Sequence, residues 1–219
     1  MSFPGKATNT HVLAALTDLL TETRLACVPE MRLLLADEVY ALWKRTERIG
    51  GSEMDLPYWA FAWCGGQALA RYVLDHPGTV AGKPVVDMGS GSGIVAIAAA
   101  LSGAASVTAC EPNVFARSAI ATNAALNGVA VDIVESSGPL GFVPDVVLAG
   151  DVFYERSIAA VMEKALEGFA LNGARILVGD PGREFLPRSR FVPVAAYDVA
   201  VMRVVEEGDA KHTEILELL

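Results

Sequence analysis

Short runs of apolar residues alternate with stretches of helical spacing from residue 83 onward. Buried parallel strands joined by helices produce such an alternation, so it predicts a doubly wound α/β sheet. Strands are expected at residues 84–88, 106–110, 129–134, 144–149, 174–179, 191–205 and 212–218. Helices are expected at residues 94–101, 114–126 and 155–169, with a hairpin turn over 206–209.

The first 79 residues have a different pattern. Apolar residues at helical spacing predict a helix over 12–24. Pro29 stands where proline is tolerated at the start of a second helix, over 30–44, and a third is expected over 63–74. Because this set is too small for an independent domain, we divide the chain into a helical extension, residues 1–79, packed on a core domain, residues 80–219.

Composition narrows the classes of protein. Hydrophobic residues make up 53% of the 219 residues and charged residues 20%, which argues against disorder. The apolar run at 94–101 is far shorter than the ~20 residues of a membrane-spanning helix. The first ten residues also lack the basic and apolar regions of a signal peptide, so we expect a cytoplasmic protein and no membrane partner.

Charge and cysteine content exclude two further kinds of site. The formal net charge of −9 argues against a nucleic-acid partner, whose affinity depends on lysine and arginine contacts to phosphates. The three cysteines are far apart, the three histidines are scattered, and neither forms a metal-ligand pattern. We therefore expect no metal.

The segment from Asp87 to Gly93 reads D-M-G-S-G-S-G and lies between a predicted strand and a predicted helix. Glycine permits positive φ angles and lets a ligand approach the backbone closely. In open α/β sheets, ligands bind at the carboxyl ends of strands, where this loop is expected. A dinucleotide fingerprint, G-x-G-x-x-G, would need its third glycine at Ile94, which argues against an NAD-binding oxidoreductase.

Two acidic residues indicate the class of ligand. Asp87 precedes the glycine loop and suits an amine-bearing ligand better than a pyrophosphate. Glu111 follows the next strand, where a carboxylate can accept both ribose hydroxyls. Together they predict S-adenosylmethionine as the ligand. The candidate binding residues at these two turns are Asp87, Gly89, Ser90, Gly91, Gly93, Glu111 and Pro112.

A second group of candidate residues follows the fourth core strand, in the segment G-D-V-F-Y. Gly150 is expected beside the methyl donor, and Asp151 and Tyr154 are expected to face its methyl group. A carboxylate can hold a lysine ammonium, and a tyrosine can orient the amine or attract a methylated cation. An aspartate that only caps the next helix is an equally good interpretation of the spacing.

Two other segments leave their interpretation open. The aromatic residues around Trp63 form either a wall over a pocket or ordinary core packing, and packing is favoured. The turn from Asp180 to Arg183 lies at the carboxyl end of a strand, where it either recognises substrate or only closes the strand.

The chain resembles the seven-β-strand protein-lysine methyltransferases in its glycine loop, in the D-x-x-Y of Asp151 to Tyr154, and in Trp63. The segments P-Y-W-A-F-A-W-C-G-G-Q-A-L-A-R-Y, G-D-V-F-Y-E and G-D-P-G-R-x-x-L-P, together with residues 23–38, are more closely similar to the family that methylates the electron-transfer flavoprotein β subunit, especially its bacterial relatives. The likeness covers most of the chain. It departs from the family after the second and third core strands, which leaves the adenine-side contacts open.

The resemblance implies a Rossmann-like, seven-stranded class I methyltransferase sheet with an antiparallel last hairpin. It implies that the loop residues and Glu111 hold S-adenosylmethionine, that Trp63 flanks the donor, and that Asp151 and Tyr154 line a lysine channel. The implied substrate is a protein, the flavoprotein β subunit. A methyltransferase acting on another protein, such as a ribosomal protein, or on a small amine stays an alternative, as does a non-catalytic binding scaffold.

Overall fold

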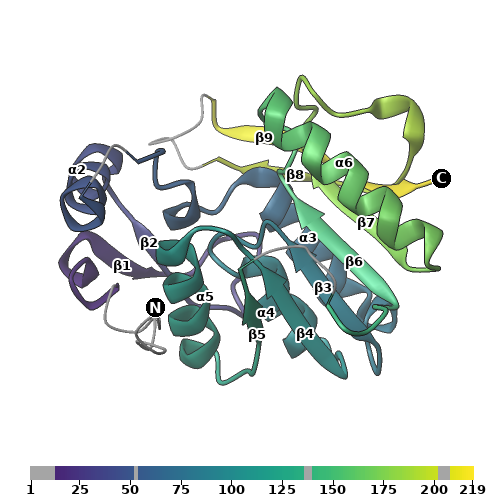
Figure 1. Cartoon of the computed structure of the whole chain (residues 1–219), viewed down its shortest axis with the longest axis horizontal. Helices are drawn as coiled ribbons and strands as arrows, with labels where there is room; N and C mark the ends of the chain where they lie inside the picture. The colour runs from purple at the N-terminus through teal and green to yellow at the C-terminus, as the bar shows by residue number, and fades with distance from the viewer. Residues whose placement is uncertain (1–12, 52–53, 136–139, 202–207) are drawn as a thin grey trace, which may run out of the picture.

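The computed structural model describes residues 13–51, 54–135, 140–201 and 208–219. A seven-stranded sheet in the order β5-β4-β3-β6-β7-β9-β8 forms its centre (Figure 1). The first five strands in this order are parallel, and β9 runs antiparallel to both β7 and β8. The strands are β3 (Pro84–Met88), β4 (Ser106–Cys110), β5 (Asp132–Val134), β6 (Val146–Gly150), β7 (Arg175–Asp180), β8 (Phe191–Ala200) and β9 (Ala210–Leu218).

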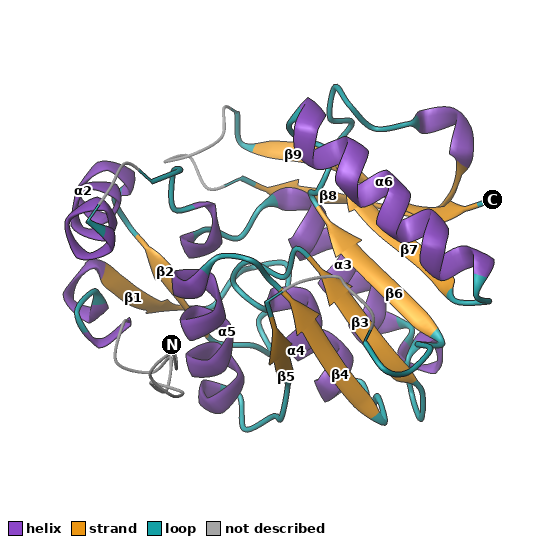
Figure 2. Cartoon of the chain, in the orientation of Figure 1, coloured by secondary structure: helices purple, strands orange, loops and turns teal. Residues whose placement is uncertain are grey.

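Helices cover both faces of this sheet (Figure 2). Helices α3 (Cys64–Asp75) and α4 (Ile94–Leu101) share a buried cluster with Val85, whereas α6 (Arg156–Leu171) shares another with Val86. Successive side chains of a strand point to opposite faces, so β3 contributes to both cores. This two-sided burial confirms the doubly wound sheet expected from the continuous apolar runs.

The order of the strands reverses at β3. The chain proceeds from β3 through β4 to β5 at one edge, and then returns to place β6 on the other side of β3. The carboxyl ends of β3 and β6 therefore lie side by side at the switch point, where ligands bind in open α/β sheets. The loop after β3 and the segment after β6 are the two segments that the sequence nominated.

Most of the expected core elements are confirmed with small shifts at their ends. The bounds of β3, β4, α4 and α5 (Val114–Leu126) agree with the expected ranges. The segment expected as one broken strand over 191–205 is observed as β8, which ends at Ala200. Residues 206 and 207 of the turn expected over 206–209 lie outside the described residues.

The helix predicted over 12–24 is wrong, and the second predicted helix begins too early. A short 3-10 turn, η1 (Thr17–Leu19), leads into strand β1 (Leu20–Thr23), which pairs antiparallel with β2 (Leu33–Ala36). Helix α2 follows only at Val39–Gly50. Leu16 and Leu20 are buried in one cluster, as their apolar spacing predicts. The backbone of β1 is nevertheless extended, because it pairs with β2.

The described part of the extension has two different relations to the sheet. Helix α3 packs on β6, β7 and β9 and against α4, while β1, β2 and α2 lie near α5 (Figure 1). The division of the chain at residue 79 stays a prediction. Among the described residues, no helix combines the length and apolarity needed to cross a bilayer.

Candidate active site

The glycine loop after β3 is built by left-handed backbone conformations. Gly89, Gly91 and Gly93 have φ angles of 66°, 54° and 84°. Two of the three also lie against neighbours: a Cβ on Gly89 would be 3.2 Å from Val152, and one on Gly93 would be 3.3 Å from Ile120. A Cβ on Gly91 would make only ordinary van der Waals contacts, at 3.9 Å from the carbonyl oxygen of Gly89 and from Cα of Trp59, so its positive φ angle rather than crowding favours glycine there.

Asp87 holds this loop from within. Its buried carboxylate accepts hydrogen bonds from the hydroxyl of Ser90 at 2.5 Å and from the N–H of Ala96, in the first turn of α4, at 3.1 Å. Burial raises the pKa of Asp87 to about 7, against the lowering effect of these two hydrogen bonds. The observed contacts of Asp87 therefore organise the loop, and its direct contact with a donor stays a prediction.

Glu111 joins the loop to the end of β4. Its Oε2 accepts from the N–H of Gly91 at 3.0 Å and its Oε1 from the N–H of Asn113 at 2.9 Å. Arg117 donates to the carbonyl oxygens of Glu111 and of Pro112. Burial raises the pKa of Glu111. Each carboxylate oxygen keeps further acceptor capacity, which is the capacity needed to bind two vicinal hydroxyls.

We predict that Gly91→Val abolishes donor binding while the protein stays folded. The change adds side-chain bulk to the candidate donor loop, and a β-branched residue resists the φ angle of 54° that this loop needs at residue 91. Isothermal titration with S-adenosylmethionine measures the loss, and thermal unfolding monitors the fold. The matched control is Gly128→Val, at φ 68° with nothing within 4 Å, in a turn far along the chain. Unchanged donor affinity in Gly91→Val would place the ligand elsewhere.

We predict that Asp87→Asn makes the protein relatively more stable as pH rises. The pKa of Asp87, about 7 in the folded state, exceeds its ordinary value of 3.8, so the folded state binds the extra proton between these values. The stability of the wild type therefore falls as pH rises from about 4 to about 7, and an amide does not titrate. Urea unfolding at pH 5 and pH 8 gives the difference between the two proteins, and an equal difference at both pH values would contradict the prediction.

Asp151 follows β6 in a strained conformation. Its φ angle of 59° is the one positive value among the non-glycine residues that the structure describes. Its Oδ2 accepts from the N–H of Gly65 at 2.5 Å, and its Oδ1 accepts from Nε of Arg183 at 2.6 Å. Gly65 lies in the first turn of α3, so Asp151 caps a helix that precedes it by 86 positions. The capping that the sequence left open is thus observed, but on α3 rather than on the helix after it.

Glycines form the contact of α3 with the strand ends, and of these the sequence nominated only Gly150, for a place beside the donor rather than for this packing. A Cβ on Gly65 would lie 2.2 Å from the carbonyl oxygen of Gly179, and one on Gly150 would lie 2.7 Å from Cα of Gly66. The backbone of α3 therefore touches the backbone of β6 and β7. The C-G-G-Q segment of the sequence carries the signal, because adjacent glycines at a helix start permit close contact.

An aromatic group stands beside Asp151. The ring of Tyr58 lies 5.8 Å from that of Trp63 and 5.5 Å from that of Tyr154, measured between centroids. Nε1 of Trp63 donates to the carbonyl oxygen of Tyr58 at 2.9 Å. Burial raises the pKa of Tyr154 to about 12, so its hydroxyl stays a hydrogen-bond donor at neutral pH. The structure thus brings Trp63 and Tyr154 together through Tyr58, which the sequence did not nominate for the site.

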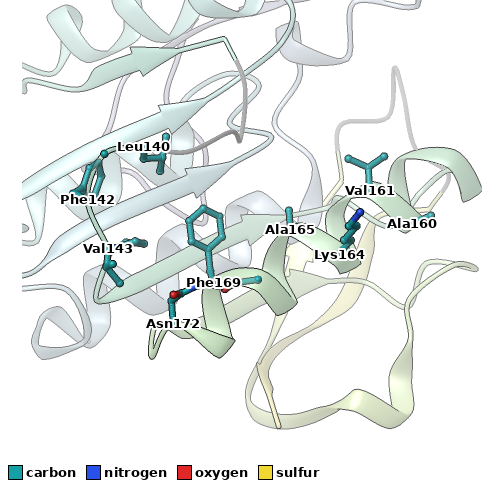
Figure 3. Close-up of a pocket in the computed structure, with 12 residues that line it drawn as sticks. Leu140, Phe142, Val143, Ala160, Val161, Lys164, Ala165, Phe169 and Asn172 are labelled. Atoms are coloured by element: carbon teal, nitrogen blue, oxygen red, sulfur yellow. Dashed lines mark hydrogen bonds between the residues drawn. The ribbon is translucent and has the colours of Figure 1, made fainter.

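A separate groove of about 780 Å³ lies away from these residues (Figure 3). It runs between the segment before β6 and the second half of α6, and Phe142, Val143 and Val161 are among its exposed apolar side chains. None of its lining residues was nominated from the sequence. None of the candidate site residues lines this groove.

Comparison with known proteins places the chain in a family of methyltransferases. The family model of ribosomal protein L11 methyltransferase (PrmA) matches residues 68–176. The electron transfer flavoprotein beta subunit lysine methyltransferase of Mus musculus is 41% identical over 160 residues, which are 71% of this chain and 62% of that protein. The homolog from Caenorhabditis elegans is 30% identical over 183 residues, covering 75% of this chain and 74% of that protein.

A solved structure shows the same fold. The magnesium protoporphyrin IX methyltransferase of Synechocystis, determined with SAM bound, aligns with a TM-score of 0.50 at 16% identity and covers 68% of this chain and 78% of that one. The strand order, the antiparallel β9 and the loop after β3 define the class I methyltransferase fold. Within that class, the chain belongs to the electron transfer flavoprotein beta subunit lysine methyltransferase family. It spans 60–62% of the length of the first vertebrate relatives that it matches.

Proposed function

We propose that this protein is an S-adenosylmethionine-dependent protein-lysine N-methyltransferase that modifies the β subunit of electron-transfer flavoprotein. One observation carries the proposal: the buried carboxylate of Asp151, with the aromatic group beside it, follows β6 directly next to the glycine loop that follows β3. On this proposal, the group that binds the ammonium lies beside the loop that binds the donor. Membership of the family supports the choice of reaction and substrate.

The donor side of the site is assigned to the loop and to Glu111. We assign Gly91 to the closest approach between the loop and the ligand, since glycine suits its φ angle of 54° and presents no side chain to the ligand. Glu111 is the acceptor for the ribose hydroxyls, while Asp87 and Ser90 hold the loop in shape. We assign Pro112, Gly150 and Trp63 to the walls of the same site.

The acceptor side must handle a cation that has to become neutral. A lysine amine has an ordinary pKa near 10.4, so its neutral form is disfavoured by about 4–5 kcal/mol at pH 7. We assign Asp151 to hold the ammonium for alignment and Tyr154 to orient the amine. The aromatic rings beside them exclude water. In the transfer a carbon–nitrogen bond forms, a carbon–sulfur bond breaks, and the proton of the amine leaves to solvent.

A ribosomal protein is the second candidate substrate. The match to the ribosomal protein L11 methyltransferase model favours it, as does a relative of that name from Syntrophotalea carbinolica that is 37% identical over 116 residues. The matched region contains the donor loop but not Trp63, so it supports the chemistry more than the choice of acceptor. For either substrate we also propose that the protein is cytoplasmic. We propose that it binds no nucleic acid, because its net charge is negative.

Methyl transfer from labelled donor tests the proposal. The purified chain is incubated with purified β subunit or with ribosomal proteins, and mass spectrometry locates the modified residues. We expect lysine methylation of the β subunit and none after its modified lysines are changed to arginine. Labelling of a ribosomal protein alone would select the second candidate. Labelling no greater than that given by Asp151→Asn would overturn both.

A further inference from the structure

Arg183 occupies the carboxylate that the proposed function assigns to the substrate. Its Nε donates to Oδ1 of Asp151 at 2.6 Å, and its Cζ lies 5.7 Å from the centroid of the Trp63 ring. The Asp151 side chain is 5% exposed and that of Arg183 is 20% exposed. The guanidinium therefore lies over the carboxylate, and an incoming cation meets the arginine before it reaches Asp151.

The surroundings of this guanidinium suit any compact cation. A carboxylate supplies a charge-assisted hydrogen bond, and an aromatic face attracts positive charge. A lysine ammonium needs the same two partners. Arg183 and a substrate lysine therefore compete for Asp151, and both cannot take the same lone pairs of Oδ1.

The backbone of Arg183 is fixed, so only its side chain has to move. Oδ1 of Asp180 accepts the N–H groups of Gly182 and Arg183, both at 2.7 Å, which closes the turn after β7. The turn keeps the backbone of Arg183 beside Asp151, because β6 and β7 are neighbours and Gly150 pairs with Gly179. The long side chain can leave while the turn stays closed.

A second hydrogen-bond acceptor for a cation lies in the first residue of this turn, Asp180. Oδ2 of Asp180 is buried and has no hydrogen-bond partner among the described residues. Burial is the first cause that raises the pKa of Asp180 to about 6, and the charge of Asp151 adds to it. Arg183 donates its Nε to Asp151 and its backbone N–H to Asp180, while Oδ2 of Asp180 keeps no partner in the part of the chain that the structure describes, so a second cation would complete the balance of charge.

We propose that Arg183 is a displaceable internal cation: it covers Asp151 in the free protein, and the substrate lysine replaces it there while the guanidinium turns to Asp180. This inference rests on the proposed function, since it takes lysine as the incoming cation. It makes Arg183 a determinant of acceptor affinity, acting through Asp151. A cation that fails to compete with a guanidinium is rejected at this point.

A binding experiment tests the displacement without requiring methyl transfer. The side-chain Nε–H signal of Arg183 is observed by ¹⁵N NMR and assigned by its loss in Arg183→Met. We expect titration with n-butylammonium, a mimic of the lysine side chain, to shift this signal, and n-butanol to leave it unchanged. A signal that stays fixed at saturating n-butylammonium would overturn the proposal, whether or not the protein proves to be a methyltransferase.

Kinetics with the β subunit give the second readout. We expect Arg183→Met to lower KM for the acceptor by about threefold to fivefold, the effect of losing one partly exposed ion pair. In Arg183→Lys we expect a KM close to that of the wild type, because lysine keeps the positive charge. Arg190→Met, which removes a guanidinium paired with Glu163 and Glu167, is the matched control and leaves KM unchanged. A raised KM in Arg183→Met would show that the arginine supports Asp151 instead of competing for it.

Asp180→Asn tests the second acceptor. The amide keeps an oxygen for the turn but replaces the unpartnered oxygen with a donor. We expect KM for the acceptor to rise in the wild-type background and to change little in the Arg183→Met background, where no guanidinium needs the site. The same increase in both backgrounds would remove Asp180 from the displacement. A wild type that transfers nothing overturns the proposed function alone, since the NMR titration still decides the displacement.

Discussion

Gly65→Ala is expected to destabilise the protein by about 3 kcal/mol or more, at the upper end of the range for overpacked cores. The added Cβ would lie 2.2 Å from the carbonyl oxygen of Gly179 and 2.8 Å from the N and Oδ2 atoms of Asp151. Two of these three atoms are backbone atoms, one in β7 and one directly after β6, so they cannot rotate away as a side chain would. Helix α3 must lift from the strand ends, which breaks its cap. Urea unfolding measures the loss.

The matched control for this change is Gly168→Ala. Gly168 lies inside α6, where a Cβ would meet nothing within 4 Å. Alanine is the better helix former, so this variant should gain about 0.5–1 kcal/mol. Equal stability of Gly65→Ala and the wild type would mean that α3 does not contact the strands as closely as the structure shows.

Asp151→Asn is expected to lower kcat by about a hundredfold, the size of loss that misplacing a reacting group causes. Asparagine tolerates the left-handed conformation at φ 59° and can still accept from Gly65, so the change removes mainly the charge. Donor affinity should stay close to that of the wild type, because the glycine loop and Glu111 do not contact this carboxylate. Calorimetry and initial rates measure the two quantities separately.

Two comparisons make this result specific. Asp198→Asn removes an exposed carboxylate paired with His212 and should leave the rate unchanged. Asp151→Ala removes the charge and the cap of α3 together, so it should lose stability as well as rate. A loss of donor affinity in Asp151→Asn would show that the carboxylate belongs to the donor side of the site.

Much of the core could be predicted because its signals are local. The strand β3, the loop after it and α4 follow one another within eighteen residues, and apolar runs broken by glycines mark their limits. The hairpin of β1 with β2 could not be predicted in this way. Leu16 and Leu20 have helical spacing, but the partner that makes Leu20–Thr23 a strand lies at Leu33–Ala36. Tertiary pairing overrode the local pattern there.

The structure places several of the nominated residues together at the strand ends, but their contacts could not be predicted. The sequence indicated Asp87, Glu111 and Asp151 because acids after strands meet at one edge of the sheet. It could not indicate that Asp87 bonds to its own loop or that Asp151 is shared between Gly65 and Arg183. These bonds join residues 9, 86 and 32 positions apart, and side-chain direction across such spans is set by packing.

The cap that Asp151 places on α3 has a consequence for the order of assembly during synthesis. A ribosome releases α3 well before Asp151 and Gly179, so the helix leaves the exit tunnel with neither its cap nor its glycine contact with the strand ends. Strand β9 then enters between β7 and β8, which closes the sheet with residues 210–218. The early chain therefore exposes an apolar helix until late strands arrive, and such a nascent chain is a natural client for a chaperone.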